Sequence, residues 1–188
     1  IYFYMNLLLL FFILYIILIL ISSKRYISIL PTIPVYPNSE KEALLVKEQI
    51  NIRNKNDVEF FKLTDPSVSH AFSHILPENI TDIDNIITQT HVSFPILFCK
   101  YLINRPRPYQ LLTSLDILHS NTGNTPAYPA GHAYQAYYLA HYFGKKYPEL
   151  QYQLDSIAER CDSVRVKAGI HYPSDGIFSK QLVNFLYK

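Results

Sequence analysis

The sequence predicts an all-α protein, a helical bundle preceded by one N-terminal hydrophobic helix. Helix-start signals and turn-forming residues divide most of the chain into segments of helical length. No segment shows the alternating pattern of a β-strand. Hydrophobic residues make up 49% of the 188 residues and charged residues 17%. This composition argues against disorder and suits a chain with a single core.

The N-terminal segment, residues 1–23, is the most apolar part of the chain. Leu7–Ile21 is unbroken apolar sequence, and a membrane-spanning helix needs about 20 such residues. We therefore expect a transmembrane anchor and a single-pass membrane protein. A cleaved signal peptide, which would place the domain outside the cytoplasm, and a buried core helix are the alternatives.

Two features bear on the side of the membrane and point in opposite directions. Lys24 and Arg25 follow the apolar segment, and positive charge favours the cytoplasmic side. The triplet Asn79-Ile80-Thr81 is a glycosylation sequon, which indicates the other side. The sequence leaves the orientation open.

A linker over residues 24–38 and a helical domain over residues 39–188 follow. Tyr26–Asn38 contains three prolines, which favour extended chain. Ser39 and Glu42 have the spacing of a capping box. Helices are predicted over 40–50, 57–63, 82–103 with a bend at Pro95, 109–119, 133–145, 149–167 and 174–187, with a turn-rich loop over 121–129. None of these helices has the composition of a membrane span.

Charge and cysteine content exclude several classes of protein. The net charge of +2 gives no basic surface for nucleic acid. Cys99 and Cys161 are too few for a disulfide framework and lack the spacing of a metal knuckle. We expect buried free thiols, with a single bridge between them as the alternative.

A first cluster of functional residues comprises Lys100 and Arg107-Pro108. The two cations are seven positions apart, about two helical turns, so they can share a helix face. The alternative interpretation is a solvated basic face.

The second cluster, Pro129-Ala130-Gly131-His132, precedes helical sequence. Gly131 allows a ligand close to the backbone, and the first N–H groups of a helix bind anions. His132 could act there as a proton donor. A helix start with an incidental histidine is the alternative.

The third cluster comprises Arg165, His171, Pro173 and Asp175. Pro173 suits the first turn of a helix, so His171 should lie just before it. Asp175 is four residues further on and could bind one imidazole nitrogen, leaving the other free to attack. An acidic residue placed at a helix start for its charge alone is the alternative.

Together the three clusters supply cations, helix starts and two histidines, which is what phosphoryl transfer requires. They resemble the type 2 phosphatidic acid phosphatase superfamily, which includes class A acid phosphatases and vanadium haloperoxidases. Its pattern is K-x6-R-P, then P-S-G-H, then S-R-x5-H-x3-D, and order and spacing agree over about Lys100–Lys180. The resemblance implies a helical bundle of that type and a metal-independent phosphatase.

The resemblance also implies a role for each site residue. Lys100, Arg107, Gly131 and Arg165 would bind the phosphate. His171 would attack phosphorus and form a phosphohistidine, and Asp175 would orient His171. His132 would protonate the leaving group and then activate water.

Two positions depart from the family pattern. Ala130 and Val164 replace serines, and the loss of one hydrogen bond to a charged group costs about 1.5–3 kcal/mol. We expect a weakened or retuned enzyme.

The leading functional hypothesis is a membrane-anchored phosphomonoesterase that acts on a lipid phosphate or a small phosphate ester without a cofactor. A vanadate-dependent haloperoxidase is one alternative, in which vanadate is the cofactor; for a phosphatase vanadate would be an inhibitor. A non-catalytic anion-binding or scaffold protein that kept the fold is the other.

Overall fold

Helices form all the regular structure of the described chain. The computed structural model describes residue 13 and residues 35–188, and the elements in this range are α-helices and one short 3-10 helix. The all-α prediction is confirmed. The predicted anchor (1–23) and most of the predicted linker (24–38) lie outside the described residues.

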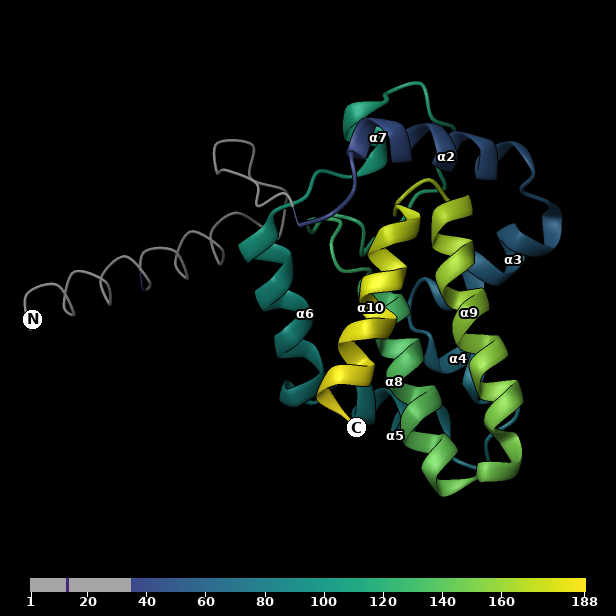
Figure 1. The fold of residues 1–188 in the computed structure, drawn as a ribbon. Helices are drawn as coiled ribbons and strands as arrows, with labels where there is room; N and C mark the ends of the chain where they lie inside the picture. Colours follow the sequence, from purple (N-terminus) through teal and green to yellow (C-terminus); the bar gives the residue numbers. More distant parts are fainter. Residues whose placement is uncertain (1–12, 14–34) are drawn as a thin grey trace, which may run out of the picture.

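The helices form a bundle around one central helix (Figure 1). Helix α8 (Gly131–Lys146) is buried over most of its length and packs against α9 (Gln151–Lys167) and α10 (Pro173–Leu186). The other elements are α2 (Ser39–Asn51), α3 (Lys55–Thr64), α4 (Ser69–Phe72), α5 (Ile80–Thr88), α6 (Thr90–Ile103), α7 (Pro108–Leu111) and the 3-10 helix Pro148–Leu150.

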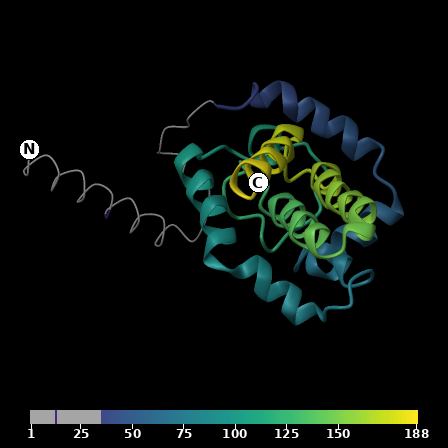
Figure 2. The ribbon, with the colours of Figure 1, turned by 60° about the horizontal axis from the view of Figure 1, so that its bottom comes forward.

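Small and aromatic side chains alternate on α8, which lets its neighbours approach on several sides. Ala133, Ala136 and Ala140 are buried beside Tyr134 and Phe143. At the α8–α9 turn, a Cβ atom added to Gly144 would overlap the Gln151 side chain. In both views α6 lies at the edge of this bundle (Figures 1 and 2).

The predicted helix over 82–103 is broken at a different place from the predicted bend. The chain breaks at Gln89 between α5 and α6, and Pro95 lies within α6; the segments Ile80–Thr88 and Thr90–Leu111 meet at 52°. Proline removes one intrahelical hydrogen bond, which would leave the His91 carbonyl without its donor. The Tyr187 hydroxyl donates to this carbonyl at 2.8 Å, so the helix continues through Pro95.

Two further sequence predictions are wrong in detail. Asn38, not Ser39, caps α2, and Glu42 turns inward instead of completing a capping box. The helix predicted over 109–119 is only the short α7, and in the irregular segment that follows it Arg53 donates to both the carbonyl and the carboxylate of Asp116.

The two cysteines are free, as expected. Cys161 is fully buried, and Cys99 is half-buried on α6. Burial raises the pKa of both thiols, to about 12 for Cys161. Neither thiol is therefore a thiolate nucleophile at neutral pH.

Within the described part of the chain, no single helix is long and apolar enough to span a membrane. By length and composition, the bent pair Ile80–Thr88 and Thr90–Leu111 together meet that test.

Candidate active site

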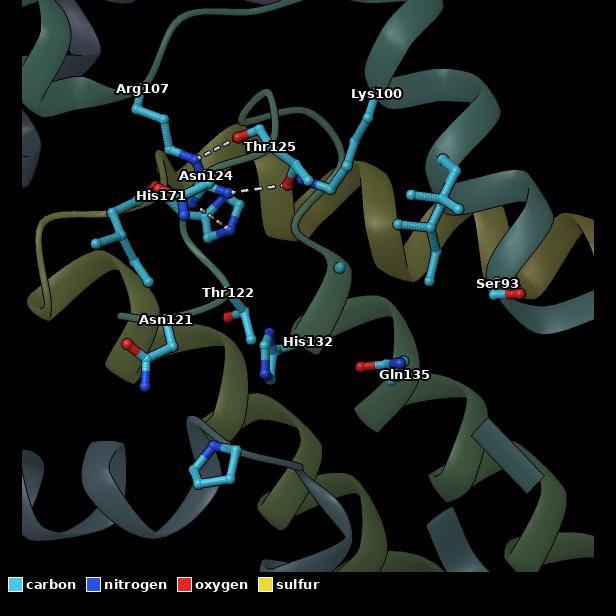
Figure 3. A pocket seen from close by; sticks show the side chains of 15 residues that line it. Ser93, Lys100, Arg107, Asn121, Thr122, Asn124, Thr125, His132, Gln135 and His171 are labelled. Carbon is cyan, nitrogen blue, oxygen red and sulfur yellow. Dashed lines mark hydrogen bonds between the residues drawn. The ribbon is translucent and has the colours of Figure 1, made fainter. Parts of the chain in front are cut away.

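A cavity of about 470 Å³ opens between α6, the start of α8 and two loops (Figure 3). The loops are residues 121–125 and residues 170–171. Of the residues predicted for the site, the cavity wall contains Lys100, Arg107, Gly131, His132 and His171. Lys100 and Ile170, which are 70 positions apart in the sequence, therefore both line this cavity.

The end of α6 determines where the first two cations lie. Asn104 adopts a left-handed conformation (φ 51°) and ends the helix, as polar residues of this kind often do. Lys100 lies in the last turn and donates to the Pro126 carbonyl at 2.5 Å. Arg107 follows the turn and donates to the carbonyls of Thr125 and Ile170, each at 2.8 Å.

Lys100 and Arg107 are buried cations that no carboxylate neutralises. They are 4% and 2% exposed, and within residues 35–188 neither forms an ion pair. Burial, and then the charge of Arg107, lowers the pKa of Lys100 well below its usual value. A buried charge is costly unless a partner of opposite sign approaches it. The wall is therefore suited to an anion.

The start of α8 adds backbone donors to the same wall. Ala130 precedes the helix and provides no side-chain cap, and Gly131 is its first residue. The N–H groups of Gly131 and His132 belong to the first turn, where a helix has no acceptors of its own. These groups and the helix dipole add positive potential to that of the two cations.

His132 is neutral when the cavity holds no anion. Burial and the nearby Arg165 lower its pKa well below the usual value. Its Nε2 lies 3.0 Å from the carbonyl oxygen of Asp65, which can only accept. Nε2 therefore carries the proton in the neutral ring, and Nδ1 is the basic nitrogen.

His171 has the geometry of an oriented nucleophile. Its Nδ1 lies 3.0 Å from Asp175 Oδ2, and its Nε2 lies 3.1 Å from the Arg107 guanidinium (Figure 3). Because a carboxylate accepts, Nδ1 carries the hydrogen and Nε2 keeps its lone pair. Burial and the charges of Arg107 and Lys100 lower the pKa of His171 well below its usual value, which keeps Nε2 unprotonated and able to accept from Arg107 Nη1.

Asp175 is fully buried behind His171. Burial raises its pKa to about 7, and the Arg105 guanidinium, 2.6 Å from Oδ1, opposes this shift. Oδ2 also accepts from the backbone N–H of Tyr172 at 2.9 Å. Three N–H donors around one carboxyl group match the ionised form, since a protonated carboxyl would need an acceptor.

Arg165 lies behind the cavity wall instead of in it. It is fully buried and donates to Asp65 Oδ1 at 3.0 Å and to the carbonyl and hydroxyl of Thr64. Its Nε is buried without a partner. In this structure Arg165 holds Asp65, whose carbonyl in turn holds His132.

Sequence reasoning missed Arg105 and Glu42, which support Asp175. The Arg105 guanidinium joins Asp175 Oδ1 and Glu42 Oε2, each at 2.6 Å, and lies over the Tyr172 ring at 3.8 Å. Arg105 lies between Lys100 and Arg107, which the sequence did identify, and this position was the one weak signal for it. Glu42 gave no signal, because its spacing to Ser39 suggested a cap.

In comparisons with known proteins, no family model matches the chain and no curated protein matches it significantly. Within residues 35–188, no three histidine, cysteine or acidic side chains gather as metal ligands do.

Proposed function

We propose that this protein is a metal-independent phosphomonoesterase that works through a phosphohistidine on His171. The observation that carries this proposal is the pair of buried cations without carboxylate partners, Lys100 and Arg107, beside the unprotonated Nε2 of His171, which accepts from Arg107 Nη1. We further propose that the bundle is of the acid phosphatase and vanadium haloperoxidase type, on the three motifs described above.

The first chemical step joins His171 Nε2 to phosphorus and breaks the bond to the leaving oxygen. Arg107, Lys100 and the Gly131 N–H would hold the phosphate oxygens, so the charge that develops on them meets fixed donors. Asp175 keeps the hydrogen on Nδ1 and stabilises the imidazolium character that grows as Nε2 bonds to phosphorus.

The leaving oxygen needs a proton, which His132 would supply. Its pKa is low because burial and cations disfavour its charged form. A phosphate dianion in the cavity reverses the electrostatic part of this shift, so His132 gains its proton as substrate binds.

The second step releases phosphate. His132, now neutral, takes a proton from water, the water oxygen bonds to phosphorus, and the bond from phosphorus to Nε2 breaks. The same residue thus serves as acid and then as base.

The experiment is hydrolysis of p-nitrophenyl phosphate by the purified full chain, combined with rapid-quench trapping of the phosphoenzyme. We expect His171→Ala to abolish both turnover and labelling. His74→Ala, which removes an exposed histidine away from the cavity, is the matched control and should leave both unchanged.

His132→Ala separates the two steps. p-Nitrophenolate leaves without a proton, so the first step should continue while hydrolysis slows by about 10²–10⁴-fold. The labelled phosphoenzyme should therefore accumulate. Tight phosphate binding without any turnover would instead favour a non-catalytic anion-binding protein and refute the proposal.

A further inference from the structure

Helix α6 carries an exposed apolar face beside the cavity. Phe94, Leu97, Phe98 and Leu102, here called the α6 apolar face, are 61%, 45%, 49% and 44% exposed. Their spacing places them on one side of the helix, and the rings of Phe94 and Phe98 stack at 5.8 Å. An exposed group of large apolar side chains of this kind marks an interaction surface.

No charge interrupts this face. Lys100 is the one charged residue of α6, and its side chain is buried on the opposite side, toward Pro126. A surface that binds a soluble protein normally has a polar rim around its apolar patch. An uncharged face of aromatic and aliphatic side chains instead suits the acyl boundary of a bilayer.

The continuous described chain begins beside the end of α6. Tyr36 lies beside the segment that follows α6, with the Arg105 guanidinium 4.2 Å from its ring centroid. In Figure 1 the continuous described chain starts near this end of α6. Thirteen residues, 22–34, separate the start of the described chain at residue 35 from the apolar segment that ends at Ile21. At about 3.3–3.6 Å per residue, thirteen residues span at most about 47 Å.

The apolar face borders the cavity. Leu97 belongs both to this face and to the cavity wall, and Ser93, one turn earlier, and the adjacent Ile96 also line the wall. One helix therefore carries the apolar surface at the cavity edge and Lys100 inside it.

We propose that the α6 apolar face inserts into the acyl boundary of a lipid bilayer, so that the cavity opens at the membrane surface. The occupant is lipid, and the apolar segment Leu7–Ile21 of the same chain keeps the domain within reach of it. This docking is independent of the proposed phosphatase activity, because it requires no chemistry in the cavity.

The absence of tryptophan from the chain provides a clean test. The full chain carrying Phe98→Trp is reconstituted into phosphatidylcholine vesicles with brominated acyl chains, which quench tryptophan by contact. Tyr152→Trp, at an 84% exposed aromatic position on α9, is the matched control. Leu102→Trp is a second probe of the same face and replaces Phe98→Trp if that variant does not fold.

We expect the emission of Phe98→Trp to shift to the blue and to fall roughly twofold or more in brominated vesicles, since a docked apolar face lies about 5–10 Å into the boundary. The control should keep the emission of a water-exposed tryptophan. Emission from the α6 probe that matches the control would overturn the proposal. A blue shift without quenching would also overturn it, because protein, either residues 1–21 or a second copy, would then cover the face.

A second measurement connects docking with access to substrate and rests on the proposed function. The double variant Phe94→Ser/Phe98→Ser should lose about tenfold of its turnover on a phosphate ester embedded in vesicles, because fewer domains dock. Turnover on p-nitrophenyl phosphate in solution should be unchanged, since neither residue lines the cavity. Loss of both activities would refute a docking role, while the quenching result stands whether or not the protein is a phosphatase.

Discussion

Replacement of Arg105 by methionine removes the cation that neutralises two buried carboxylates. The Arg105 side chain is fully buried and donates to Glu42 and Asp175, each at 2.6 Å, and to the hydroxyls of Ser174 at 2.7 Å and Ser39 at 3.1 Å. The variant keeps most of the side-chain volume but leaves Asp175, 0% exposed, and Glu42, 7% exposed, without their counter-charge.

The expected cost follows from this arrangement. Removal of one partner from a buried ion pair costs about 3–5 kcal/mol, because the remaining charge stays desolvated. For a chain of this length, 1 kcal/mol shifts Tm by about 2–4 °C, so Tm should fall by roughly 6–20 °C. Glu42→Gln leaves the Arg105–Asp175 pair intact and removes hydrogen bonds to a charged group worth about 1.5–3 kcal/mol, so it should cost less.

The assay is thermal unfolding of the full chain in detergent micelles, followed by far-ultraviolet circular dichroism. Lys180→Met is the control: it removes a cation from an exposed pair with Glu159, at 3.0 Å, and should lower Tm by less than about 4 °C. The double variant Arg105→Met/Glu42→Gln should lose less than the two single losses added together, because both act on one network. A loss for Arg105→Met no larger than that of the control would refute the reasoning, as would strict additivity.

Three further predictions concern charge and helix capping. Lys100→Met removes a buried cation that has no carboxylate partner, so Tm in phosphate-free buffer should not fall, but the rise in Tm on adding inorganic phosphate should disappear. Ala130→Ser supplies the cap that α8 lacks and should raise stability by about 1 kcal/mol, seen as a higher Tm; a lower Tm would contradict this. Burial raises the pKa of Asp162 from 3.8 to about 6, so the folded chain keeps a proton that the unfolded chain loses, and stability should fall as pH rises through this window. The free energy of unfolding, measured with denaturant, should fall for the wild type by at most about 3 kcal/mol more than for Asp162→Asn between pH 4 and pH 7. Equal pH profiles for the two proteins would exclude the effect.

The sequence indicated most of the helices and the charged and histidine side chains of the cavity wall. The spacing of Lys100 and Arg107, and the Gly-His and His-x3-Asp motifs at helix starts, gave residues that the structure brings to one cavity, with Asp175 behind His171. These features are local: a turn residue, a proline or a four-residue spacing fixes the relation between neighbours whatever the rest of the fold does.

The sequence alone determined the helical class, the helix starts that carry His132 and His171, and the set of charged residues available to a site. Only the tertiary structure decided which charges neutralise one another. Arg105 meets Glu42 and Asp175, and Arg165 meets Asp65, so Lys100 and Arg107 are the cations left for an anion within the cavity wall. Such pairings join residues 63 to 100 positions apart, and burial gives each of them its strength, so no local pattern can encode them.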